Sequence, residues 1–218
     1  MENVDPAQLV FAVGRIGPGG LQLLGTCFSV EQHLLATAAH VTAGDDRQLC
    51  VIPAKTKSLN DYQDNRSNQF QFLRASIHSI NPTTDVALLK VETKLPAKLR
   101  LSSSDAADVG QTVKMWGYPH ADLNRAVLTQ FSAQVGAKVI VGTAATGVKH
   151  LVINSQARTG QSGGPVFLDS AVIGLVVGAF SPVPAGKGIM LGNIDPYTLH
   201  QTTHVVSAEY VGELLADG

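Results

Sequence analysis

The sequence predicts an all-β protein. Short segments rich in Val, Ile, Leu, Phe and Thr recur along the 218 residues, and Gly, Pro, Asn or Asp separate them at intervals typical of sandwiches and barrels. Helical periodicity is missing until the C-terminus. Hydrophobic residues make up 44% of the chain, which is enough for one large core or two smaller ones.

The expected strands run from one end of the chain to the other. They are Leu9–Arg15, Leu21–Val30, His33–Thr37, Gln71–Ile80, Val86–Val91, Val113–Tyr118, Val127–Val135, Lys138–Val141, Leu151–Asn154 and Val172–Phe180. Lys55–Asn68 has mixed charges and almost no apolar side chains, which predicts an exposed loop. Leu101–Gly110 is small and polar, so we expect it to connect two halves, residues 1–100 and 101–218.

A short amphipathic helix is expected at the C-terminus. Ser207 has the side chain of an N-cap, and Glu209 would stand in the first turn. The apolar residues that follow this pattern fall on one helical face; they are Val206, Tyr210, Val211, Leu214 and Leu215.

Charge and hydropathy exclude two classes of partner. The chain has 16 Lys and Arg against 17 Asp and Glu, a net charge of −1, and it has no basic stripe that would follow a phosphate backbone. We therefore expect no nucleic acid partner. The longest apolar stretch, Ala171–Phe180, is far shorter than the roughly 20 residues that cross a bilayer, so no membrane partner is expected either.

The cysteines and the N-terminus indicate a cytoplasmic protein. The first residues, Met-Glu-Asn-Val-Asp-Pro, are acidic and lack the basic region and apolar run of a secretion signal. Cys27 and Cys50 are too few for a disulfide framework. We expect both to be reduced thiols that serve as small buried hydrophobes.

The glycine-rich segment Gly160-Gln161-Ser162-Gly163-Gly164-Pro165 suggests a nucleophile. A serine hydroxyl needs an adjacent base and a stabilised oxyanion before it reacts at neutral pH. Glycines allow a tight turn, which can direct the N–H groups of Gly160 and Ser162 toward one point. The alternative is an ordinary glycine-rich turn that contains a serine.

Two further residues are ambiguous when taken singly. His40 follows an apolar strand and two alanines, which would suit an imidazole held in a cleft or a purely structural histidine. Asp85 directly precedes a strand that reads as buried. A carboxylate there would need a donor such as an imidazole N–H, or it could be a turn residue after Pro82.

Together, these segments resemble the trypsin–chymotrypsin superfamily. The matching pieces are Thr-Ala-Ala-His ending at His40, Asp-Val-Ala-Leu-Leu-Lys starting at Asp85, and Gly-Gln-Ser-Gly-Gly-Pro-Val starting at Gly160. Trp116-Gly117-Tyr118-Pro119 and the closing helix have counterparts too. The details are most similar to compact bacterial members and to Deg-type proteases, without a following PDZ module.

The resemblance implies two six-stranded antiparallel barrels with an active site between them. His40, Asp85 and Ser162 would form a catalytic triad, and the N–H groups of Gly160 and Ser162 an oxyanion hole. It implies a polypeptide substrate, serine endopeptidase activity, and no cofactor or metal. A cytoplasmic peptidase without a regulatory domain would be hazardous to the cell, so we also expect a regulatory protein partner.

Three positions depart from that pattern. Gln161 replaces an aspartate that pairs with a newly cut N-terminus in digestive members, so we expect the oxyanion turn to form in the intact chain. Val41 replaces a disulfide-forming cysteine. The strand Val172–Gly178 lacks a serine that donates to the aspartate in many relatives.

The resemblance also outlines a specificity pocket. Gln156 would form its floor, and Val176, Val177, Gly178 and Leu191 its walls. No carboxylate or basic group stands among these residues, so the pocket would accept an uncharged, apolar side chain on the acyl side of the cleaved bond.

Three alternatives stay open at this stage. An α/β-hydrolase would use the same Gly-x-Ser-x-Gly segment with Asp195 and His200 or His204, but it needs helices that the pattern lacks. A catalytically silent barrel could serve as a binding module. A metal site could use His200 and His204, which lie four residues apart at helical ligand spacing, but these two histidines are expected to flank a loop or strand.

Overall fold

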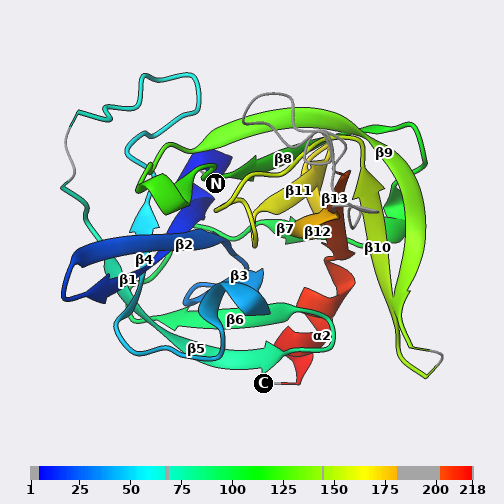
Figure 1. Cartoon of the computed structure of the whole chain (residues 1–218), viewed down its shortest axis with the longest axis horizontal. Coiled ribbons are helices and arrows are strands. Elements are labelled where there is room, and N and C mark those ends of the chain that lie inside the picture. Colours follow the sequence, from blue (N-terminus) through cyan, green and yellow to red (C-terminus); the bar gives the residue numbers. More distant parts are fainter. Residues whose placement is uncertain (1–4, 67–68, 144, 181–201, 218) are drawn as a thin grey trace, which may run out of the picture.

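The computed structural model describes residues 5–66, 69–143, 145–180 and 202–217. It confirms the all-β class, with two six-stranded antiparallel barrels and a short C-terminal helix among the described residues (Figure 1). The strands are β1 (Val10–Gly17), β2 (Gly20–Ser29), β3 (Leu34–Ala38), β4 (Leu49–Pro53), β5 (Leu73–Asn81), β6 (Val86–Val91), β7 (Arg100–Leu101), β8 (Thr112–Gly117), β9 (Thr129–Gly142), β10 (Gly147–Ile153), β11 (Pro165–Leu168), β12 (Ala171–Phe180) and β13 (Thr202–Ser207). The helices are α1 (Ala39–Thr42) and α2 (Glu209–Ala216), with 3₁₀ turns η1 (Pro6–Leu9), η2 (Ser104–Ala106) and η3 (Ala121–Leu123).

The first barrel closes in the strand order β1-β2-β3-β6-β5-β4. Its strand β6 is almost wholly apolar and buried, with only Lys90 exposed. β5 instead alternates between partly buried and exposed residues, because a barrel strand directs every second side chain inward. Cys27 and Cys50 lie buried in this barrel without a bridge, as predicted. Burial raises the pKa of both thiols, that of Cys50 to about 11.

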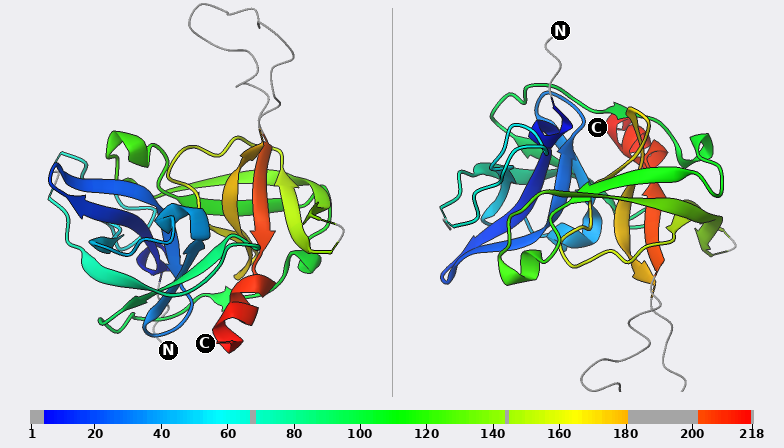
Figure 2. Two further views of the ribbon diagram at one scale, coloured as in Figure 1. Left: turned by 60° about the horizontal axis from the view of Figure 1, so that its bottom comes forward. Right: turned by 90° about the horizontal axis from the view of Figure 1, so that it is seen from above.

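The second barrel follows the order β11-β8-β9-β10-β13-β12, and a pairing between β11 and β12 closes it. The short strand β7 pairs in parallel with the first two residues of β12. Met115, Leu151, Ile153 and Val205 are among the fully buried side chains of its core. The two barrels lie side by side in both views of Figure 2.

Several strands were not expected from the sequence. Four of the described strands lie outside the predicted segments: β4, β7, β11 and β13. β4 and β7 are short, β11 begins in the glycine-rich turn, and β13 runs into the expected start of the helix. β9 is also continuous where a break at Gly136 was expected. A Cβ at Gly136 would lie 2.3 Å from Oδ1 of Asn154, so this glycine permits close packing and does not end the strand. The described part of 55–68 contains no helix or strand, in accord with the predicted loop.

The start of the C-terminal helix differs from the prediction. Ala208, not Ser207, is the N-cap of α2. Ser207 still belongs to β13, and its buried hydroxyl donates to Oε2 of Glu209 at 3.1 Å and accepts the N–H of Ser104 at 3.0 Å. The helix then packs against β6 and β5 of the first barrel. In the described part of the chain, neither helix is long and apolar enough to cross a membrane.

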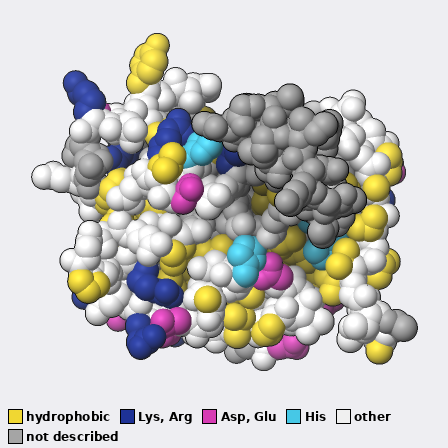
Figure 3. Space-filling model, in the orientation of Figure 1, with side chains coloured by type: hydrophobic (Ala, Val, Ile, Leu, Met, Phe, Trp, Pro, Cys, Tyr) yellow, Lys and Arg dark blue, Asp and Glu magenta, His cyan; other side chains and the backbone are white. Residues whose placement is uncertain are grey.

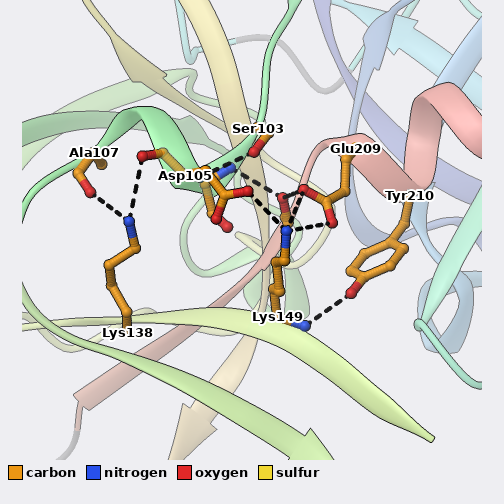
Figure 4. A network of polar contacts seen from close by, with 9 residues as sticks. Ser103, Asp105, Ala107, Lys138, Lys149, Glu209 and Tyr210 are labelled. Atoms are coloured by element: carbon orange, nitrogen blue, oxygen red, sulfur yellow. Dashed lines mark hydrogen bonds and ion pairs between the residues drawn. The ribbon is translucent and has the colours of Figure 1, made fainter.

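A polar network ties α2 to the second barrel (Figure 4). The ammonium of Lys149 lies 2.7 Å from Asp105 and 3.2 Å from Glu209, and this contact lowers the pKa of Asp105. Lys138 donates to the carbonyl of Ala107 at 2.8 Å, beside the same aspartate. Water screens exposed ion pairs of this kind, so each contributes little to stability. The network joins the start of α2 to β9, β10 and the connection between the barrels.

Candidate active site

His40 lies where β3 leaves the first barrel. β3 runs directly into α1, and the two alanines between them, Ala38 and Ala39, are buried. The N–H of Ala39 donates to the main-chain carbonyl of Asp85 at 3.0 Å, and Ala38 pairs with Val86. The small residues predicted to hold an imidazole thus let the chain turn against the start of β6, beside Asp85.

Asp85 contacts His40 at two points. Its Oδ1 accepts the main-chain N–H of His40 at 2.9 Å, and its Oδ2 lies 2.6 Å from Nδ1 of the ring. The residue has φ +56°, an uncommon conformation for a non-glycine residue. The preceding turn is closed by Asn81, whose Oδ1 accepts the N–H groups of Thr83 and Thr84. Because Nδ1 is engaged, Nε2 is the ring nitrogen left to exchange a proton with another group.

The outer side of Asp85 borders a cavity of about 350 Å³. Val177 of β12 lines this cavity; β12 is the strand that lacks the serine donor found in many relatives. His150 and His204 line it as well, with ring centroids 5.8 Å apart. Burial, and then the charge of His204, lower the pKa of His150. The sequence gives no sign that these two histidines meet, because only the pairing of β10 with β13 brings them together.

The turn at Ser162 requires glycine at two positions. Gly160 has φ +94° and Gly163 has φ +82°, a region that side chains disfavour. A Cβ at Gly160 would also lie 2.3 Å from the carbonyl oxygen of Tyr118, and one at Gly163 would lie 2.1 Å from that of Thr26. The segment is therefore a tightly packed turn, held between β8 and β2.

Hydrogen bonds hold the Ser162 turn in its conformation. The side chain of Gln161 is only 3% exposed, and its Oε1 accepts the N–H of Arg158 at 2.7 Å. The main-chain N–H of Gln161 donates to Arg158 at 3.0 Å, and its carbonyl accepts the N–H of Gly164 at 3.0 Å. Within the described residues, the N–H groups of Gly160 and Ser162 have no acceptor. Two donors are thus left for a ligand oxygen.

The nucleophile candidate lies against the strands that lead to His40. The carbonyl of Ser162 accepts the N–H of Thr26 at 2.8 Å, and a Cβ at Gly163 would lie 3.0 Å from the nitrogen of Ala38. No hydrogen bond joins the hydroxyl of Ser162 to His40, both of which belong to the described part of the chain. In unliganded enzymes this contact is often long and shortens when substrate binds.

The candidate specificity residues separate into four groups. Gln156 is partly buried between β10 and the Ser162 turn, and Val177 and Gly178 line the cavity beside Asp85. The side chain of Val176 is 1% exposed and packs in the second core. Its main chain bonds to Gly163 and Gly164. Leu191 lies outside the described residues, as do Asp195 and His200 of the alternative readings.

The metal-site and α/β-hydrolase alternatives can be compared with the described residues. Among the described residues, no group of three or more His, Cys, Asp or Glu side chains could hold a metal ion. On the face in Figure 3, Lys and Arg side chains are interspersed with acidic and apolar ones. The all-β topology contradicts the α/β-hydrolase alternative, which needs a parallel sheet with helices between its strands.

Similar folds occur in bacterial proteases. The active form of the Rv3671c protease from M. tuberculosis superposes with a TM-score of 0.67 at 22% identity, covering 97% of this chain and 81% of that one. The MamO protease domain from Magnetospirillum magneticum gives 0.67 at 17% identity, covering 98% of each chain. The HtrA-type protease AlgW with a decapeptide gives 0.68 at 16% identity, covering 96% of this chain and 64% of AlgW. At these identities the similarity concerns the fold.

The sequence comparison assigns the family. No curated protein matches the chain. Residues 25–178, well over half of the chain, match the family described as the trypsin-like peptidase domain. This segment contains His40, Asp85 and Ser162 and both glycines of the tight turn. The chain therefore belongs to the trypsin-like peptidase family and is a serine-type peptidase.

Proposed function

We propose that the protein is an endopeptidase that hydrolyses peptide bonds through an acyl-enzyme on Ser162. The observation that carries this proposal is that an oriented His40–Asp85 pair and a turn with two available N–H groups occur in the same structure. The Asp85 carboxylate holds the ring of His40 at 2.6 Å, and the Ser162 turn leaves two N–H groups without an acceptor in the described part of the chain. A base with an oriented ring and a site for an oxyanion are the two requirements of a serine nucleophile.

Each residue then has a defined role. The hydroxyl oxygen of Ser162 attacks the peptide carbonyl while Nε2 of His40 takes its proton. The N–H groups of Gly160 and Ser162 stabilise the negative charge that develops on the carbonyl oxygen. His40 gives its proton to the leaving amine, and water later releases the acyl group by the same path. Asp85 stays ionised and stabilises the imidazolium.

The edge of β12 offers a place for the substrate backbone. β11 pairs with β12 only as far as Leu175, and Val176 bonds to Gly164 in the Ser162 turn. Beyond this point, β12 pairs only with β13 among the described residues. An extended polypeptide can add to a free strand edge through main-chain hydrogen bonds. Such a peptide would pass directly beside Ser162.

We further propose a preference for uncharged apolar residues on the acyl side of the cleaved bond. Gln156, Val177, Gly178 and Leu191 would surround that side chain, and none of them carries a charge. Apolar pockets distinguish side chains by only about 1–3 kcal/mol per methylene. We therefore expect a graded preference among Leu, Val, Met and Ile.

A second candidate function is a catalytically silent binding module with the same fold. The observation that favours it is the absence of a hydrogen bond between Ser162 and His40, both within the described residues. A module of this kind would bind polypeptide at the β12 edge without cleaving it. The two unbridged thiols support a reducing, cytoplasmic location for either function.

The test is cleavage of a random peptide library by the intact protein, read by mass spectrometry. Ser162→Ala should abolish all cleavage, whereas Ser170→Ala, the same change at an exposed serine, should leave the cleavage pattern unchanged. No cleavage by the folded wild-type protein would reject the peptidase in favour of the binding module. Cleavage mainly after Arg, Lys, Asp or Glu would reject only the proposed preference.

A further inference from the structure

Thr26 links the first barrel to the Ser162 turn. It lies in β2 and is completely buried, and neither the sequence motifs nor the proposed mechanism uses it. Its main-chain N–H donates to the carbonyl of Ser162 at 2.8 Å. Its hydroxyl donates to the carbonyl of Gly160 at 2.7 Å. A single residue of one barrel therefore bonds to both ends of the candidate oxyanion turn on the other.

The direction of the hydroxyl proton follows from its two neighbours. The Thr26 hydroxyl oxygen also lies 3.2 Å from the main-chain N–H of Tyr118. Since an amide N–H can only donate, the hydroxyl accepts from Tyr118 and must direct its own proton to Gly160. The threonine is itself held in place, because its carbonyl accepts the hydroxyl of Thr37 at 2.7 Å. The N–H, the carbonyl and the hydroxyl of Thr26 are therefore all hydrogen-bonded, which fixes the orientation of the residue.

The bond to Gly160 restrains the main chain at a residue that has no side chain. With φ +94° and no side chain, Gly160 can rotate its flanking peptides more freely than other residues. The peptide before it is held by the N–H of His120, which donates to the carbonyl of Thr159 at 2.8 Å. The Thr26 hydroxyl holds the carbonyl of the peptide after it. The Gly160 N–H belongs to the first of these peptides. The second peptide, which limits rotation at Gly160, is held by the Thr26 hydroxyl and by the Gln161 N–H, which donates to the Arg158 carbonyl at 3.0 Å.

We propose that Thr26 is a positioning residue of the oxyanion site. Its hydroxyl keeps the Gly160 carbonyl directed into the protein, so that the Gly160 N–H stays available to the developing oxyanion. This inference rests on the proposed peptidase function. It predicts an effect on the transition state, where the oxyanion forms, and little effect on substrate binding.

The experiment compares Thr26→Val, Thr26→Ser and Ser29→Ala. Valine replaces the hydroxyl by a methyl group of similar size, and serine restores the hydroxyl. Ser29 is a matched control, because it lies on the same strand, is equally buried and donates to the carbonyl of Ala97 at 2.6 Å, away from the turn. Kinetics use the fluorogenic version of the peptide that the wild-type protein cleaves best in the library.

We expect Thr26→Val to lower kcat about tenfold to a hundredfold, less than the loss of a direct oxyanion donor, with KM changed by less than about twofold. Thr26→Ser should restore kcat to within about threefold of wild type, and Ser29→Ala should keep it. A peptide boronate of the same sequence, which places an anionic oxygen in the site, should bind Thr26→Val more weakly in proportion to kcat.

Three outcomes would overturn the inference: an unchanged kcat in folded Thr26→Val, an equal loss in Ser29→Ala, or no recovery in Thr26→Ser. If circular dichroism shows that Thr26→Val does not fold, Thr26→Cys replaces it, because a thiol is a weaker donor than a hydroxyl. Its kcat should fall below wild type by less than the roughly tenfold to hundredfold expected for valine. A kcat equal to wild type in Thr26→Cys would reject the inference. Failure of the proposed function is distinct, because it appears as activity that Ser162→Ala retains or that wild type lacks.

Discussion

The two halves of the candidate site are built by different means. In the first barrel, side chains make the site, since the carboxylate of Asp85 holds the ring and the N–H of His40. In the second barrel, the main chain makes it. Carbonyl and N–H groups around Ser162 are bonded in place, and glycines at positive φ allow the turn. The first half is therefore vulnerable to the loss of a functional group, and the second to the addition of a single methyl.

Removing the proposed nucleophile or base should have the largest effect. Ser162→Ala and His40→Ala should each lower kcat by about 10⁴–10⁶, because the members of such a triad act as a unit. Both side chains are partly or largely exposed, so the melting temperature should change little. Initial rates on the library-derived peptide measure the loss. Activity within tenfold of wild type in either variant contradicts the assignment.

Asp85→Asn tests the side-chain half alone. The amide can no longer accept from Nδ1 of His40 as a carboxylate does, so the ring loses its orientation and the imidazolium loses its counter-charge. We expect kcat to fall by about 10⁴. Asp122→Asn, at an exposed position of η3, is the matched control and should retain full activity. A fall of less than tenfold for Asp85→Asn would show that the pair is structural.

Gly160→Ala tests the main-chain half. The new methyl group would lie 2.3 Å from the carbonyl oxygen of Tyr118, at a φ of +94°. The turn must shift, which should lower kcat by about 10²–10³ through loss of an oxyanion donor. Gly19→Ala, where nothing lies within 4 Å of the added Cβ, should leave kcat unchanged. Equal activity of the two variants would mean that the Gly160 N–H takes no part.

The smallest expected effect concerns stability and pH near Asp85. Because burial lowers the pKa of His150, the folded protein binds fewer protons there than the unfolded chain does. Stability should therefore be highest above the ordinary histidine range, near pH 6.5, and fall as the pH drops below it. His150→Gln should reduce the fall in melting temperature between about pH 7 and pH 5.

The control for this effect is His78→Gln, since His78 is exposed on β5. It should show the same fall in melting temperature as the wild-type protein. Identical curves for His150→Gln and the wild type would show that His150 does not take up a proton on unfolding.

Local patterns were enough to predict the all-β class and to single out the glycine-rich segment at Ser162, but not the contacts between distant strands. His40 follows an apolar strand and Asp85 precedes one, but each was ambiguous alone and became a candidate through the family resemblance; the structure places them in contact. β4 and β13 are short and lack a distinctive pattern, so their pairing partners had to be seen. Gly136 shows the same limit, because its role depends on Asn154 of a neighbouring segment.

The supporting contacts of the site were beyond sequence reasoning for a related reason. Thr26 reaches Gly160 across 134 residues of chain, and no motif surrounds it. His150 and His204 meet only because β10 and β13 are neighbours in the second barrel. Residues that react have characteristic local sequences, whereas residues that position them are defined by packing between the barrels.

The most direct test of the central claim is labelling with a fluorophosphonate, which reacts only with an activated serine. We predict a single adduct on the intact protein, located by tandem mass spectrometry on Ser162. It should be absent in His40→Ala and formed at the wild-type rate in Ser170→Ala. No adduct on the folded wild-type protein, an adduct on another serine, or undiminished labelling in His40→Ala would contradict the account.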